Sequence, residues 1–221
     1  MTLSENAYSA IRRDILQGVL VPGQPLRMAE LSQTYGMGFS PLREALSRLQ
    51  AERLVLAQAL RGFRVAPLSI EEMQDAINTR ILIETDALCL SVLHGDDDWA
   101  AAIVSTLYAL NVQVERAKSM PVDVWEIESR HYAFHRALLA ACGSPWRLEF
   151  FDRLYAATER YRIPVLATSR MYGQPGRDVQ AEHGALADAA LSRDAVTATR
   201  LLKAHYEKTA LSIRDRMRKA D

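Results

Sequence analysis

The chain has 221 residues, of which 49% are hydrophobic and 24% charged, with 27 basic and 27 acidic side chains. This composition fits one large or two ordinary globular domains and excludes a disordered chain. No apolar run approaches the roughly 20 residues that span a bilayer, and the first residues lack an export signal. Cys89 and Cys142 are the only cysteines. We therefore expect a cytoplasmic protein with reduced thiols and no membrane partner.

The net charge of zero conceals a difference between the two ends of the chain. Residues 1–67 carry eight arginines, no lysine and five acidic residues, a formal charge of +3, whereas residues 68–221 carry −3. Arginine favours forked contacts to phosphate and guanine, which lysine cannot make. The excess is modest, and from charge alone an ordinary solvated surface is as good an explanation as a nucleic-acid partner.

Residues 1–67 have the pattern of a small helical unit with two strands. Gly36 ends the second helix, and Ser40 followed by Pro41 predicts the third, with Ser40 as its N-cap. Pro67 ends the unit. The spacing of apolar residues predicts helices over 6–20, over 28–35 and from Ser40 onward, then strands over 54–60 and 62–65.

Everything after Ser69 has a helical pattern. Ser69 and Glu72 match a capping box, which starts a long helix that reaches about residue 93. Strand-like alternation and internal repeats are absent from the sequence. Further helical runs cover roughly 99–117, 122–141, 146–166, 179–191 and 193–219. We expect a mainly α protein, with a winged helix-turn-helix domain over 1–67 and an all-α antiparallel bundle of about six helices over 68–221.

Helix, glycine-containing turn, helix and two-stranded wing is the order of a winged helix-turn-helix domain, whose second helix enters the major groove of DNA. Arg43, near the start of that helix, is the expected base contact, because arginine commonly takes guanine O6 and N7 in a fork. Ser40 and the helix N-terminus suit a phosphate. Arg48 lies farther along, toward the DNA backbone, and Arg61 with Gly62 forms the wing tip. Each arginine is also compatible with an ordinary surface position.

The runs SPLREALSRL at 40–49 and RGFRV at 61–65 resemble the GntR family of bacterial transcription regulators, and the helical remainder resembles the FCD effector domain of its FadR-type subgroup. The resemblance covers essentially the whole chain. It implies a homodimer that binds a pseudo-palindromic double-stranded DNA operator. The family usually has arginine two residues before the proline of the recognition helix, where this chain has Phe39. Phe39 either contacts a thymine methyl group or packs.

Four of the five histidines lie in the C-terminal part of the chain. His131 and His135 are four residues apart in one helical run, so they leave the same helix face, and His183 and His205 lie in two later runs. The FCD resemblance implies one divalent metal per chain, held by three histidines and an acidic residue. Here His131 takes the acidic position. Imidazole ligands favour Zn or Ni over hard ions.

Four further residues are candidates for binding an effector. The resemblance places Arg80 at the cavity of the bundle, and a buried arginine needs an anion. Glu84, one helical turn later, is an internal candidate for that anion, and a ligand carboxylate is the other. Arg160 and Arg162 would add a second anion clamp. Together with a metal, these arginines suit a small mono- or dicarboxylate.

Two other functions compete with a ligand-responsive regulator. A zinc peptidase needs His-Glu-x-x-His, but Tyr132 follows His131. A di-iron bundle needs two Glu-x-x-His motifs, and only Glu128 with His131 supplies one. A metal-dependent hydrolase would also leave the winged unit unexplained. An architectural DNA-binding protein with an inert bundle is the second alternative, against which the histidines argue. We therefore expect a regulator that is not an enzyme, and more specifically a repressor.

Overall fold

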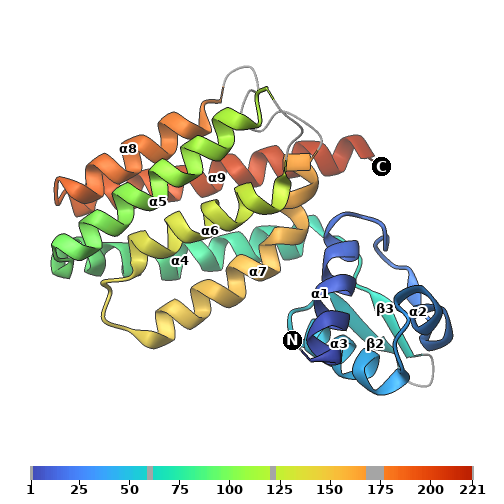
Figure 1. Ribbon diagram of the computed structural model, residues 1–221. Coiled ribbons are helices and arrows are strands. Elements are labelled where there is room, and N and C mark those ends of the chain that lie inside the picture. The colour runs from blue at the N-terminus through green and yellow to red at the C-terminus, as the bar shows by residue number, and fades with distance from the viewer. Residues whose placement is uncertain (1, 59–61, 120–122, 168–176, 221) are drawn as a thin grey trace.

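The computed structural model describes residues 2–58, 62–119, 123–167 and 177–220. Figure 1 shows a small N-terminal domain beside one end of a larger helical bundle. None of the helices in these ranges is long and apolar enough to cross a membrane. The expected mainly α architecture, with a winged helix-turn-helix followed by a helical bundle, is confirmed.

The N-terminal domain packs three helices against a small sheet. Its helices are α1 (Leu3–Leu16), α2 (Met28–Tyr35) and α3 (Phe39–Ala51), and its strands are β1 (Pro25–Leu26), β2 (Val55–Gln58) and β3 (Gly62–Val65). The strands are antiparallel in the order β1-β3-β2, and β2 and β3 form the wing. The two-residue strand β1 was not expected, because so short an element has no detectable periodicity.

The start of α3 differs from the expectation. The N-cap is Gly38, not Ser40, and the helix begins at Phe39. Gly38 has extended backbone angles, as an N-cap requires. Pro41 then occupies the third helical position, which is tolerated because the first N–H groups of a helix have no partner within the helix. Ser40 is therefore inside the first turn of α3.

The bundle contains helices that begin at well-formed caps. The oxygen of Ser69 accepts a hydrogen bond from the backbone of Glu72 at 3.0 Å, which is one half of the capping box that the sequence predicted. Asp96, Asp123 and Asp178 cap three later helices in the same way. The bundle helices are α4 (Ile70–His94), α5 (Asp97–Arg116), α6 (Val124–Leu139), α7 (Pro145–Ala167), α8 (Val179–Leu191) and α9 (Ala195–Ala220).

Each part has its own hydrophobic core. In the bundle, α4 packs against α6, α7 and α9, and α8 packs against α5 and α9. The N-terminal core is built from side chains such as Ile11, Leu42 and Leu49, but it also includes Ile163 of α7. Helix α1 accordingly packs against α7, so α7 is part of both the bundle and the junction between the two parts.

Candidate metal centre and nucleic-acid interface

Three bundle helices bring four histidines to one buried place. Helix α6 supplies two of them, and α8 and α9 supply one each. All are 5% exposed or less. One ring nitrogen of each lies within 4.8 Å of those of the other three. The members of this histidine cluster are His131, His135, His183 and His205.

Two tyrosines orient the histidines of α6. Nδ1 of His131 lies 2.7 Å from the hydroxyl of Tyr155, which is itself 3.4 Å from the carbonyl oxygen of Glu128. The hydroxyl therefore donates to that carbonyl and accepts from Nδ1–H, which leaves the lone pair of His131 Nε2 as a ligand atom, 3.1 Å from Nε2 of His135. The hydroxyl of Tyr206 donates to Glu84 at 2.5 Å and lies 3.3 Å from Nδ1 of His135. It therefore accepts from Nδ1–H of His135, which leaves Nε2 of that ring as the ligand atom.

Glu182 orients the histidine of α9. Its Oε2 accepts from Nδ1 of His205 at 2.8 Å and also from Arg177 at 2.8 Å. Burial raises the pKa of this carboxyl, but the hydrogen bonds from His205 and Arg177 outweigh that effect and hold the pKa well below its usual range. A carboxylate on the outer nitrogen of a histidine is a common support for a metal ligand. The Glu128 carboxylate, by contrast, pairs with Arg162.

His183 is fully buried, and neither of its ring nitrogens has a hydrogen-bond partner among the described residues. An unpaired buried polar group costs about 1–3 kcal/mol, so this position needs an explanation. Burial is the largest cause that lowers the pKa of all four histidines. For His205 the hydrogen bond to Glu182 acts in the opposite direction on the pKa, and burial still outweighs it. The imidazoles are therefore neutral at neutral pH, which is the form that binds metals.

This set of residues fits a divalent metal. One ring nitrogen from each of the four histidines lies within 4.8 Å of the other three. Two Zn–N bonds of about 2.1 Å span at most about 4.2 Å, so a modest closing of the side chains would bring all four rings to one ion. Four imidazoles suit Zn, Ni or Cu, whereas Mg and Ca require oxygen ligands. The bound ion would act as a Lewis acid toward an anion placed beside it.

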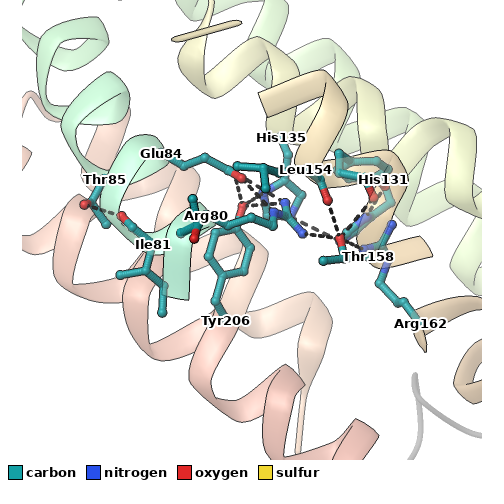
Figure 2. Close-up of polar contacts among 12 residues, drawn as sticks. Arg80, Ile81, Glu84, Thr85, His131, His135, Leu154, Thr158, Arg162 and Tyr206 are labelled. Carbon is teal, nitrogen blue, oxygen red and sulfur yellow. Dashed lines mark hydrogen bonds and ion pairs between the residues drawn. The ribbon is translucent and has the colours of Figure 1, made fainter. Parts of the chain in front are cut away.

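The buried arginines next to the cluster are engaged in ion pairs, and Figure 2 shows the pair that Arg80 forms with Glu84. Arg80 donates to both oxygens of Glu84, at 2.6 and 3.4 Å. It also donates to Thr158 at 3.2 Å and to Tyr206 at 3.0 Å. Glu84 is thus the partner of Arg80, the internal pairing that the sequence left open. Arg162 pairs in turn with Glu128. Both arginine charges are balanced within the protein.

Arg160 points elsewhere. It donates to the carbonyl oxygens of Arg53 at 2.9 Å, Ala66 at 2.5 Å and Pro67 at 2.7 Å. These groups belong to the N-terminal domain and its connection to the bundle. The structure therefore gives Arg160 a position different from the anion clamp that the sequence suggested.

The predicted DNA-contacting residues lie on the exposed face of α3 and in the wing. Ser40, Arg43 and Arg48 are exposed, and the Arg48 guanidinium lies 4.1 Å from the centre of the Tyr8 ring. Gly62 starts β3 with a φ of 84°, a left-handed conformation that favours glycine. Arg61 lies outside the described residues. Phe39, at the first turn of α3, is 52% exposed, so it does not pack into the core of this chain.

Sequence reasoning missed the two tyrosines that orient the histidines. Tyr155 and Tyr206 lie in helices that have no local motif linking them to His131 or His135. Glu182 neighbours His183 in the sequence but supports His205 on the next helix. Contacts between helices depend on how those helices pack, and residue spacing within one helix does not reveal them.

A winged domain with exposed arginines on α3, joined to a helical bundle with a buried histidine cluster, is typical of a DNA-binding transcription regulator. Residues 3–65 match the model of the bacterial regulatory proteins of the gntR family, and residues 75–208 match the FCD domain. The chain belongs to the gntR family of bacterial regulators, with a C-terminal FCD domain.

Two curated relatives and one solved structure agree with this family assignment. The chain is 41% identical to the uncharacterized HTH-type transcriptional regulator BphR of Paraburkholderia xenovorans strain LB400, over 96% of this chain and 86% of BphR. It is 34% identical to the HTH-type transcriptional repressor GlaR of Escherichia coli K12, over 93% of each chain. The structure of E. coli McbR/YncC shares the fold, with a TM-score of 0.77 and 18% identity over 98% of this chain and 99% of that one. The family and the two curated relatives are transcriptional regulators, not enzymes, so the hydrolase alternative is set aside.

Proposed function

We propose that the protein is a homodimeric repressor of the bacterial cytoplasm whose FCD domain holds one divalent metal, Zn or Ni, and responds to a small carboxylate. The observation that carries the metal is the unpaired, fully buried ring of His183 beside three histidines whose outer nitrogens are already held. The printed name of GlaR, a repressor at 34% identity, supports the direction of regulation.

The charge of the site supports an anionic effector. The four imidazoles are neutral, and the ion pairs of Arg80 with Glu84 and of Arg162 with Glu128 balance themselves. A divalent ion would therefore bring an uncompensated double positive charge into a buried place, which is costly without a counterion. A ligand carboxylate at the metal would supply that charge, and it would compete with Glu84 for the forked donors of Arg80.

Metal analysis tests the first part of the proposal. Purified protein should contain close to one Zn or Ni per chain, and the His135→Ala/His183→Ala double variant should lose it. His94→Ala, which changes an exposed histidine at the end of α4, is the control and should keep the metal. Full metal retention in the double variant would place the ion elsewhere. A metal-free parent that ignores added carboxylates would favour the architectural alternative.

For DNA, we propose that Arg43 contacts a base, that Ser40 and Arg48 contact the backbone, and that Arg61 with Gly62 forms the wing tip. The exposure of Ser40, Arg43 and Arg48 on α3 supports this assignment. Arg43→Ala should cost about 1–3 kcal/mol of operator binding and relax sequence preference at one position. An operator selected from random sequence with the parent protein provides the probe. Unchanged affinity of Arg43→Ala for that operator would refute the assignment.

A further inference from the structure

The C-terminal half of α7 lies at the end of the bundle that faces the N-terminal domain (Figure 1), and α7 packs against both α1 and α6. Because helical residues three and four apart share a face, these turns present two different sets of side chains. Tyr155, Thr158 and Arg162 contact residues of the bundle interior, whereas Glu159, Arg160 and Ile163 contact the N-terminal domain.

Arg160 contacts the C-terminal end of α3, the helix expected to enter the major groove and called the recognition helix below. Its guanidinium donates to the carbonyl of Arg53, directly after the C-cap of α3, and to the carbonyls of Ala66 and Pro67, where the domain connects to the bundle. Arg160 is buried, and the acceptors of its described hydrogen bonds are all backbone carbonyls. Carbonyls at the C-terminal end of a helix carry partial negative charge, so they can balance a cation at this point. One planar side chain therefore ties α3, the connection and α7 together.

Glu159, the preceding residue of α7, reaches the same end of α3 by a second route. It pairs with Arg12 of α1, and Arg12 also lies 3.4 Å from Glu52, the C-cap residue of α3. The hydroxyl of Tyr8 donates to the other oxygen of Glu52 at 2.6 Å. Two adjacent residues of α7 thus hold the C-terminal end of α3 by two routes, one direct and one through Arg12.

We propose that Glu159 and Arg160 are positioning residues that fix the orientation of the recognition helix relative to the bundle, and thereby set the half-site spacing that the dimer binds. A dimer must present its two recognition helices about one turn of DNA apart, roughly 34–36 Å. A loosely joined domain would accept a range of spacings, whereas a domain held at two points accepts few. This inference rests on the proposed dimeric operator complex.

The test compares a duplex with one half-site and duplexes with two half-sites, whose spacing is changed by single base pairs. The full chain is used, as parent, Arg160→Met and Arg153→Met. Arg153 is the matched control, because it lies on α7, is exposed, and among the described residues pairs with Glu149 alone. Arg160→Met should keep the half-site affinity of the parent, lose about tenfold or more of its affinity for the best-spaced duplex, and accept other spacings nearly as well. Arg153→Met should behave like the parent.

Parental spacing preference in Arg160→Met would overturn the inference. So would an equal loss of half-site and two-site affinity, because that result would mean damage to the domain that contacts DNA. If Arg160→Met does not fold, Glu159→Gln answers the same question, since it removes the charge paired with Arg12 and keeps the side-chain shape. A parent that binds single and double half-site duplexes equally would instead refute the proposed dimeric complex, a result distinguishable without any variant.

Discussion

Replacing His183 by leucine should change the stability of the protein in opposite directions with and without metal. In the metal-free protein, both ring nitrogens of His183 are buried without a partner. A leucine of similar size has no polar atoms that need a hydrogen-bond partner. His183→Leu should therefore raise the free energy of unfolding by about 1–3 kcal/mol. With free zinc at about 1,000 times its dissociation constant, the parent gains about 4 kcal/mol from binding. The variant should lose most of that gain.

Urea denaturation of the parent and of His183→Leu, each in EDTA and in excess zinc, measures the free energy of unfolding without and with metal. The variant should be the more stable protein in EDTA and the less stable one in zinc. His94→Leu changes an exposed histidine and should leave the zinc effect intact. The reasoning fails if His183→Leu keeps the zinc stabilisation of the parent. A strong destabilisation of the variant in EDTA would show instead that the His183 ring has a partner.

Three more predictions follow from the site. Tyr155→Phe removes the hydroxyl that orients His131 and should weaken metal affinity about 10–100-fold, measured by competition with a chelator; an unchanged affinity would contradict the orienting role. Arg80→Met should lower the free energy of unfolding by about 3–5 kcal/mol, because it leaves the Glu84 carboxylate buried and unpaired. The double variant Arg80→Met/Glu84→Met should recover most of that stability. If urea denaturation gives the same loss for the single and the double variant, the pairing is contradicted. Because burial, and then neighbouring charge, lowers the pKa of the clustered histidines, unfolding takes up protons. The stability of the metal-free protein should therefore hold above about pH 6.5 and fall below it, by up to about 1.4 kcal/mol per pH unit per histidine. Denaturation in EDTA at several pH values measures this slope, and a flat profile would contradict it.

Much of the architecture could be predicted from local sequence signals. Apolar spacing located the helices, and the Ser69 cap marked the start of α4 because capping is a short-range interaction. The same kind of signal misplaced the start of α3, since Gly38 and Ser40 are both good N-caps and the sequence does not reveal which one the preceding turn selects. Strand β1 was missed because its pairing partner β3 lies far along the chain.

The site could be predicted only in part, for a related reason. The histidines are recognisable by residue type and helical position, and the structure brings all four together. The partners that orient them come from other helices, so Tyr155 and Tyr206 gave no signal in the sequence. Arg160 is a residue type that commonly binds anions, but in the structure it binds backbone carbonyls. Every residue has a backbone carbonyl, so no sequence motif identifies these partners.

The placement of Ile163 of α7 within the core of the N-terminal domain has a consequence for protein engineering. Exchanging DNA-binding heads between regulators by cutting the chain after Pro67 would leave that isoleucine, and the partly buried Val124 and Trp125 of α6 beside it, facing a foreign surface. A chimera that also transfers the matching positions of α6 and α7 would keep the packing between the N-terminal domain and the bundle. The exchangeable module is thus a discontinuous one, composed of the N-terminal domain and the bundle surface on which it packs.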